Sequence, residues 1–309
     1  MTADLDHRVR LAAFAFLTEQ RQLHGEVLDR TLLQKGFEFD GRRVPLMGPQ
    51  GIFKPAILPE MPLSITTVPV IHNQPRPYED EVGPDGLLRY RYRGQDPQHR
   101  ENVGLRRAMQ TRTPLIYNFG VVKGRYMPVW PVFVTSDNPA SLTFSVAIDD
   151  AKSLAMDAAV NAEQGVDARR QYVTGLVRHR LHQRAFRDRV LDAYREQCAI
   201  CRLKHEELLD AAHILPDSHP KGDPIVPNGL ALCKLHHAAF DRNILGIRPD
   251  LKVEIRLDVL NEEDGPMLRY GLQGFNGALL KVPRVKGLRP DPEFLGERYD
   301  IFRQGQPGI

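Results

Sequence analysis

Apolar residues follow a helical spacing at the start of the chain. Between residues 5 and 29 they recur every three or four positions, which predicts an amphipathic helix. The positions are Leu11, Phe14, Leu17, Leu23 and Val27. The pattern continues to Leu33 and is ended by Gly36. We therefore predict a helical N-terminal cap over this stretch.

The pattern changes between residues 37 and 148, where Pro and Gly recur and short β-favouring runs lie between them. We expect strands at residues 65–68, 88–92, 115–117, 129–134 and 142–148. Short strands separated by frequent turn signals are typical of a compact β-rich domain or an open barrel. From residue 149 to residue 197 helical spacing returns, with arginines on the remaining surface. We interpret this stretch as a helical connector whose arginines either contact phosphates or form a solvated face.

The composition, with 42% hydrophobic and 26% charged residues in 309, suits two soluble domains of ordinary size. No run of about 18 apolar residues is present, which predicts no membrane span. The N-terminus lacks the pattern of a secretory signal. The three cysteines cluster with histidines, which favours metal binding in a reducing compartment over disulfides. We expect a cytoplasmic protein of bacterial type.

Positive charge is uneven along the chain, although the formal net charge is only +3. From Glu81 to Tyr126 there are nine Lys/Arg and four Asp/Glu, and from Val166 to Arg195 eight Arg and three Asp. Two basic blocks on an otherwise balanced chain favour a polyanion such as nucleic acid as partner. The alternative is an ordinary solvated surface.

Two pairs of metal-ligand residues lie near the C-terminal third of the chain. Cys198 and Cys201 have C-x2-C spacing, and Cys233 and His236 have C-x2-H spacing. Three thiolates and one imidazole can close a tetrahedral zinc site. Because the surrounding module is small, a structural Zn²⁺ would supply part of its folding energy.

Three further residues stand between and beside these pairs in the order His213, Asn228, His237. They lie in L-D-A-A-H-I-L-P, in P-N-G-L and in H-H-A-A-F-D. A histidine ending a strand, a loop asparagine and a histidine in a following helix resemble the HNH nuclease motif. The resemblance implies that His213 is the general base, that Asn228 tethers the loop and orients that base, and that His237 binds a catalytic divalent metal such as Mg²⁺ or Mn²⁺.

The remaining metal ligands are open. Asp241 lies four residues after His237, so both project from one helix face and can hold one ion; charge compensation at a helix N-terminus is the alternative role for Asp241. Many HNH enzymes carry an aspartate directly before the base histidine, where this chain has Ala212. Asp210 is the nearest acid, and whether it ligates the catalytic metal is left open.

Residues 40–135 resemble, in patches, the SRA (YDG) domain, which flips modified cytosine out of DNA. P-Y-E-D-E-V at Pro77–Val82 is similar to the family's G-Y-E-D-D-V, and R-Y-R-Y-R-G at Arg89–Gly94 stands where the family has T-Y-T-G. E-N-V-G-L-R-R-A at Glu101–Ala108 falls near its N-x-A-L segment, and M-G-P-Q-G-I at Met47–Ile52 resembles the family's loop that probes the DNA helix.

The SRA resemblance implies a base pocket. Tyr78 and Tyr92 would sandwich the flipped base, and either Glu81 or Asp80 would accept a hydrogen bond at its Watson–Crick edge. Arg93, in the R-G flank, is placed with them at the DNA. The alternative is that both tyrosines are ordinary strand aromatics packing a β-rich core.

Together these features predict an α+β chain in three parts: an SRA/PUA-like β-rich barrel domain with its helical cap at 1–150, a helical connector at 151–190, and a zinc-stapled ββα-metal HNH domain at 191–309. The expected function is cleavage of double-stranded DNA that carries 5-methylcytosine or 5-hydroxymethylcytosine, as in modification-dependent restriction. Double-strand cleavage by one such site per chain allows for a homodimer. Two alternatives stay open: an HNH endonuclease that senses phosphorothioate or plain sequence, and a non-catalytic zinc-stapled DNA-binding protein.

Overall fold

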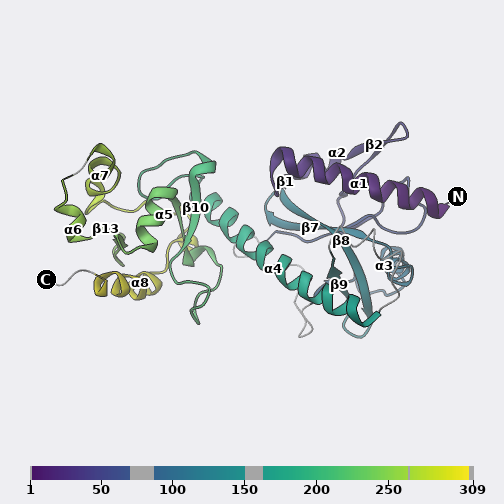
Figure 1. The fold of residues 1–309 in the computed structure, drawn as a ribbon. Helices are drawn as coiled ribbons and strands as arrows, with labels where there is room; N and C mark the ends of the chain where they lie inside the picture. Colours follow the sequence, from purple (N-terminus) through teal and green to yellow (C-terminus); the bar gives the residue numbers. More distant parts are fainter. Residues whose placement is uncertain (1, 70–86, 150–162, 264, 306–309) are drawn as a thin grey trace. The chain divides into compact units, whose positions relative to one another are not determined.

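The computed structural model describes residues 2–69, 87–149, 163–263 and 265–305 (Figure 1). It divides into two compact units, an N-terminal unit at Met1–Leu181 and a C-terminal unit at His182–Ile309. Both contain helices and strands, so the α+β class is confirmed. Among the described residues no helix is long and apolar enough to cross a membrane.

The N-terminal unit is built on a seven-stranded sheet with the order β4-β5-β7-β8-β9-β6, to which β1 adds by pairing with β8. The strands are β1 (Leu28–Asp29), β4 (Ile52–Phe53), β5 (Ser64–Thr66), β6 (Leu88–Arg91), β7 (Leu115–Val122), β8 (Arg125–Asn138) and β9 (Thr143–Ile148). The β5–β7 pair is parallel and the other pairs are antiparallel. All five strands expected from the sequence are present.

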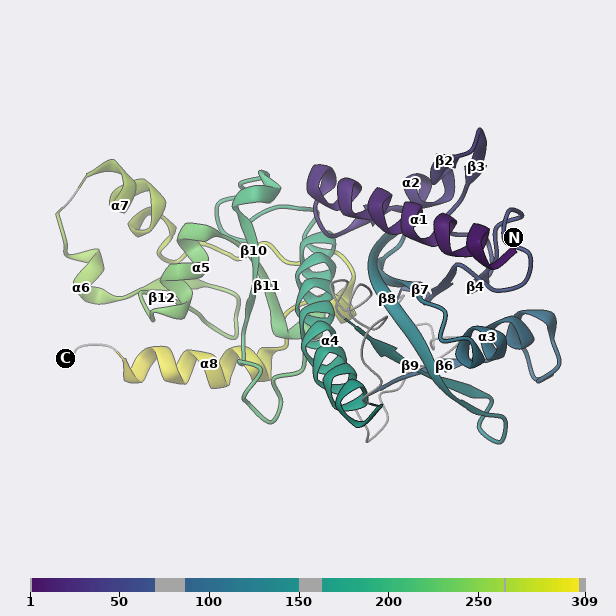
Figure 2. The same ribbon diagram turned by 45° about the vertical axis from the view of Figure 1, so that its right-hand side comes forward.

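The sheet curls, as Figure 2 shows. β4 and β6 are the two ends of its hydrogen-bonded order. Nevertheless the Tyr90 hydroxyl of β6 donates to the Thr66 carbonyl of β5, next to the opposite end, over 3.2 Å. The two ends of the sheet therefore approach each other through a side chain, and no backbone pairing of the described strands closes the sheet into a barrel.

The N-terminal cap is two helices, not the single helix to Gly36 that its apolar pattern suggested. α1 (Thr2–His24) ends at Gly25, whose φ of +82° lies in the left-handed region that favours glycine. After β1 the chain forms α2 (Arg30–Lys35) and a hairpin of β2 (Phe37–Phe39) and β3 (Arg42–Val44). The apolar stripe of α1 packs into the core of this unit. A further helix, α3 (Arg100–Gln110), lies against β8.

The stretch expected to be a helical connector, 151–190, contains most of α4 (Glu163–Ala193), a helix that begins in the N-terminal unit and ends in the C-terminal unit. Residues 151–162 of that stretch lie outside the described part of the chain. In the C-terminal unit the last turns of α4 belong to the core, with Ala185, Phe186 and Val190 at 2% exposure or less. The end of α4 is therefore part of the framework that supports the C-terminal unit.

The rest of the C-terminal unit is small elements around one core. They are η2 (Glu206–Leu208), β10 (Leu209–His213), η3 (Val226–Asn228), β11 (Gly229–Cys233), α5 (Lys234–Asp241), β12 (Leu245–Ile247), β13 (Val253–Ile255), α6 (Leu257–Leu260), α7 (Pro266–Gly271), η4 (Gln273–Phe275), η5 (Lys286–Leu288) and α8 (Pro292–Gln304). β10 and β11 form an antiparallel pair, and α5 follows β11 directly (Figure 2). This pair and its helix are the ββα unit expected from the sequence.

Candidate active site and metal centre

His213 is the last residue of β10 and lies opposite Gly229, the first residue of β11. A Cβ at position 229 would come within 2.4 Å of Val190 and 2.9 Å of Phe186 on α4, so glycine allows the hairpin to approach that helix. The Phe186 ring also stacks on the His213 imidazole, with centroids 4.0 Å apart and planes 16° from parallel. The end of α4 thus fixes the plane of the candidate base.

Burial lowers the pKa of the His213 imidazole below its usual value. Asp217 and Asp241 oppose this shift, whereas the nearby His237 reinforces it. Asp217 Oδ1 lies 3.0 Å from His213 Nε2, although the angles are not those of a hydrogen bond. The lowered pKa favours the uncharged imidazole, which is the form that can accept a proton from water.

Asn228 holds the loop that follows His213. The side chain is fully buried; its Nδ2 donates to the Leu215 carbonyl at 2.9 Å and to the Asp223 carbonyl at 3.1 Å, and its Oδ1 accepts from the Leu215 amide at 2.9 Å. The Asn228 carbonyl also accepts from the Ile214 amide. Because both ends of the amide are used within the loop, Asn228 fixes the backbone on which His213 is placed.

His237 lies between two carboxylates. Asp210 Oδ2 of β10 is 3.5 Å from His237 Nδ1, and Asp241 Oδ2 is 3.3 Å from Nε2. Asp210 raises the pKa of His237, and Asp241 adds to this shift. Burial raises the pKa of the Asp210 carboxyl, but His237 and Lys234, whose Nζ is 3.1 Å away, outweigh burial and hold that pKa well below its usual range.

Asp241 is the last residue of α5, so the suggested role at a helix N-terminus is wrong. A carboxylate at the C-terminal end of a helix opposes the helix dipole and gains nothing from it. Arg298 of α8, a residue only 9% exposed, compensates: its guanidinium donates to the Phe240 carbonyl and to Asn243 Oδ1. Arg298 therefore fixes the end of α5 that carries Asp241.

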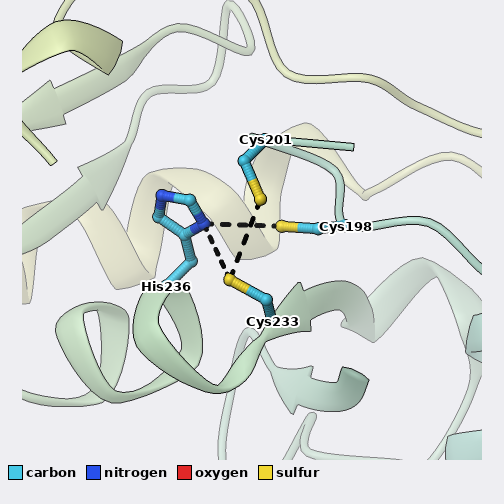
Figure 3. A group of neighbouring side chains, drawn as sticks. All are labelled: Cys198, Cys201, Cys233 and His236. Carbon is cyan, nitrogen blue, oxygen red and sulfur yellow. Dashed lines mark hydrogen bonds between the residues drawn. The ribbon is translucent and has the colours of Figure 1, made fainter. Parts of the chain in front are cut away.

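The four cysteine and histidine ligands lie together in the structure (Figure 3). Their ligand atoms are all within 4.8 Å of one another. The separations are 3.8 Å from Cys201 Sγ to Cys233 Sγ, and 3.5 and 3.1 Å from His236 Nδ1 to the sulfurs of Cys198 and Cys233. A tetrahedral zinc ion would require about 3.8 Å between sulfurs and about 3.6 Å between sulfur and nitrogen. The donor set therefore fits a metal ion, and all three cysteines are free thiols with no disulfide between them.

The orientation of His236 also fits a ligand. Its Nε2 lies 2.9 Å from the Gly271 carbonyl, which can only accept a hydrogen bond, so Nε2 donates and Nδ1, which faces the sulfurs, is the nitrogen left to bind an ion. The Cys198–Cys201 turn is fixed on the other side, because the Ala199 amide donates to the Ala231 carbonyl of β11 at 2.7 Å. The metal centre thus ties the turn after α4 to the start of α5.

One family model matches the segment that holds these residues. Residues 198–248 match the family model described as HNH endonuclease. The segment contains all the zinc-ligand and catalytic candidates named above, and the chain therefore carries a nuclease domain. A search of curated proteins found no match. Among solved structures, one named "Modification dependent TagI restriction endonuclease" is 17% identical, with 81% of this chain and 83% of that chain covered and a TM-score of 0.30.

The candidate base-pocket residues are described only in part. Tyr78, Asp80 and Glu81 lie outside the described residues. Tyr92 is 2% exposed; its ring packs on Phe144 with centroids 4.6 Å apart, and its hydroxyl donates to Asp137.

Arg93 is about half exposed, and its backbone N–H and carbonyl are held by Asn102, at 2.8 and 3.1 Å. Asn102 belongs to the segment E-N-V-G-L, which resembles an SRA segment. The loop after β6 is therefore fixed by that segment, and the Tyr92 ring is covered on the described structure.

Three residues that shape the HNH segment were not picked out from the sequence. Phe186 is one of several apolar residues on α4, Asp217 lies in a turn after the strand, and Arg298 follows in a helix without a motif. Each becomes visible only through its contact with His213 or with α5. Of the three, only Asp217 offered a weak indication, since it is an acid four residues from the candidate base.

Proposed function

We propose that the C-terminal unit hydrolyses phosphodiester bonds of double-stranded DNA, with His213 as the general base. The observation that carries this proposal is the HNH segment's geometry, in which a half-buried imidazole, its pKa lowered by burial, is stacked on Phe186 at the end of a hairpin whose loop is held by Asn228. His213 accepts the proton of the attacking water. Asn228 and Phe186 keep the imidazole in one orientation while it does so.

His237 and Asp241 would hold the catalytic divalent ion, with Asp210 as the group that orients His237. A histidine ligand commonly donates its other N–H to a carboxylate. Asp210 faces Nδ1 and is already engaged by Lys234, whereas Asp241 lies beside Nε2 and is 58% exposed. Because the two carboxylates differ in this way, we expect Nε2 of His237 and the Asp241 carboxylate to be the ligands of Mg²⁺ or Mn²⁺. When bound, the ion would stabilise the negative charge that develops at the scissile phosphate.

The Cys198, Cys201, Cys233 and His236 cluster is proposed to hold Zn²⁺ as a structural ion. The four residues would fill all four coordination positions of a tetrahedral ion, so none would be left for water or substrate. The cluster would therefore stabilise the fold of the unit and take no part in the chemistry.

The N-terminal unit is proposed to recognise modified cytosine, on the strength of the SRA resemblance of Pro77–Val82, Arg89–Gly94 and Glu101–Ala108. In this proposal Tyr78, with Glu81 or Asp80, receives the flipped base, and Arg93 contacts the DNA. Tyr92 would join the sandwich only if its packing on Phe144 opened. That burial favours one alternative: an HNH endonuclease whose N-terminal unit senses phosphorothioate or plain sequence without the sandwich.

Cleavage of matched duplexes tests the proposal. Duplexes with unmodified cytosine, 5-methylcytosine and 5-hydroxymethylcytosine would be incubated with the chain in Mg²⁺, in Mn²⁺ and in chelator, with the His213→Ala variant as control. We expect metal-dependent cutting that favours the modified duplexes. Equal cutting of all three contradicts modified-base recognition alone, whereas no cutting in either metal contradicts the nuclease.

The base pocket is tested by Tyr78→Ala and Tyr92→Ala. We expect Tyr78→Ala to lower the preference for modified DNA by about 1–3 kcal/mol, the contribution of one base–aromatic stack. The matched Tyr92→Ala variant separates a sandwich from a core aromatic. If Tyr92→Ala lowers stability and leaves the preference unchanged, Tyr92 is a packing residue.

A further inference from the structure

A basic segment lies near the end of the C-terminal unit. Residues 265–290 contain five Lys/Arg and no Asp/Glu. Four of the five lie between residues 281 and 289, a stretch that we call the basic strap. They are Lys281, Arg284, Lys286 and Arg289, and all four are exposed. Such a run creates a local positive potential on a chain whose net charge is only +3.

The strap differs from the two basic blocks found in the sequence, because many arginines in those blocks are paired with carboxylates. Arg106 binds Asp137 at 2.6 Å, Arg170 binds Asp149 at 2.9 Å, and Arg187 lies near three acids and donates to two carbonyls. Within the described part of the chain, none of the four strap cations is in an ion pair. Arg289 has one internal contact, from Nε to the Pro283 carbonyl at 3.2 Å.

The backbone of the strap is fixed at both ends. The Lys281 amide donates to the Ala199 carbonyl of the Cys198–Cys201 turn at 2.8 Å. Just beyond the strap, the Asp291 amide donates to the Pro227 carbonyl at 3.0 Å, and η5 packs on η3. Since η3 contains Asn228, the strap leads from the metal centre to the loop that positions His213. The backbone that carries the four cations is therefore anchored at one end to the metal-centre turn and at the other to the loop that positions His213.

We infer that the basic strap binds the phosphate backbone of duplex DNA beside the bond to be cut. The inference rests on the proposed nuclease function and adds a contact surface outside the HNH motif. Nine residues span at most about 30 Å, and phosphates recur every 3.4 Å or so of rise on each strand, so the four cations can meet several phosphates. Phosphate contacts fix position and carry no base information. The strap thus supplies sequence-independent affinity.

The test compares two variants with the same change in net charge. The strap variant is Lys281→Ala, Arg284→Ala, Lys286→Ala and Arg289→Ala. The control variant removes four cations of the same unit that lie in ion pairs: Lys221→Ala, Arg248→Ala, Lys252→Ala and Arg256→Ala. Both are made in the full chain with His213→Ala, so that binding to an unmodified, mixed-sequence duplex is measured without cutting.

The measured quantity is the slope of log Kd against log salt concentration between about 50 and 200 mM. Each phosphate contact contributes about 0.9 to this slope, so we expect the strap variant to lower it by about 3 to 4, and the control variant by less than about 1. A smaller variant, Lys281→Ala with Lys286→Ala, should lower it by about 2 and avoids the internal contact of Arg289. The charge-retaining pair Arg284→Lys and Arg289→Lys should keep the parent's slope.

Equal slopes for the parent and both strap variants overturn the inference. An equal decrease of the slope in the four-residue strap variant and in the control variant also overturns it, because the decrease would then reflect net charge alone. Tighter binding of the parent to duplex RNA than to DNA overturns DNA as the partner. Cutting is measured separately in chains that retain His213. If the parent binds DNA through the strap and does not cut it in Mg²⁺ or Mn²⁺, the proposed function fails and the strap inference stands.

Discussion

His236 and His237 are neighbours on α5 and belong to two different centres. His236 is 1% exposed and turns Nδ1 toward the three sulfurs, while its Nε2 is fixed by the Gly271 carbonyl. His237, with 22% of its side chain exposed, lies between the carboxylates of Asp210 and Asp241. Because consecutive helical side chains do not share a face, one helix can serve a closed structural site and an open reactive one.

The difference between the two centres lies in how completely the protein fills them. The four ligand atoms of the metal centre lie within 4.8 Å of one another, and the protein supplies the whole tetrahedral set. Around His237 the two carboxylates face different ring nitrogens. An ion bound to either nitrogen would therefore have only one of the two carboxylates as a neighbour. A set that the protein leaves incomplete has room for water and a phosphate, as catalysis requires.

The largest expected effect is on the open centre. His213→Ala should lower the cleavage rate by about 10²–10⁴-fold, because only the proton transfer is lost. Rates under single-turnover conditions, with thermal unfolding of the same preparation, check this. The melting temperature and DNA affinity should stay those of the parent. Cutting at nearly the parent's rate would remove His213 from the role of base.

The closed centre should respond in the opposite way. Cys201→Ser removes one ligand of the proposed zinc ion and should lower the free energy of unfolding by about 4 kcal/mol or more, in the range typical of a lost metal site. Metal analysis should find one zinc per chain in the parent and less in the variant. His213→Ala is the matched control, with full zinc and full stability. A folded, active parent without zinc would contradict the structural role.

The sequence predicted the HNH segment well because its information is local. C-x2-C and C-x2-H spacings fix which side chains can meet one ion, and the H-N-H order places the other residues on a strand, a loop and a helix. The same short range explains why the position of Asp241 within its helix was predicted wrongly. Where Asp241 sits in α5 depends on where the helix begins, and Cys233 acts as its N-cap, so Asp241 is at the end.

The N-terminal unit was harder to predict because its information is long-range. Strand positions follow from short apolar runs, and all five expected strands are present. The curl of the sheet depends on contacts such as Tyr90 to Thr66, and the burial of Tyr92 depends on Phe144 and Asp137 from β9 and β8. Nothing in R-Y-R-Y-R-G specifies which tyrosine is covered. Phe186 and Arg298 act on the HNH segment across similar sequence distances.

A smaller effect should separate the two carboxylates beside His237. Asp241→Asn should weaken Mn²⁺ binding about 100-fold and Asp210→Asn about 10-fold, because an asparagine oxygen at position 210 can still accept the Nδ1 proton. Titration of zinc-loaded protein with Mn²⁺, by calorimetry or electron paramagnetic resonance, measures both. Asp250→Asn, an exposed carboxylate of the same unit, is the control. The reverse order would make Asp210 the ligand and Asp241 the supporting group.

The smallest effect expected is a displacement of the acid limb of the pH–rate profile, and it distinguishes the two histidines of the open centre. The pKa of His213 is lowered by burial, and that of His237 is raised by Asp210. A base works only when unprotonated, so at saturating metal the rate should fall about tenfold per pH unit below a midpoint that lies under about 6.5.

His237 must lose its proton to bind the ion, and its raised pKa places that step above about 6.5. At low metal concentration the limb should therefore move to higher pH, and added Mn²⁺ should return it. Profiles at several Mn²⁺ concentrations measure both midpoints. A single midpoint that does not change with Mn²⁺ concentration would mean that His237 does not bind the ion. A midpoint above 6.5 at saturating metal would mean that burial does not set the protonation of the base.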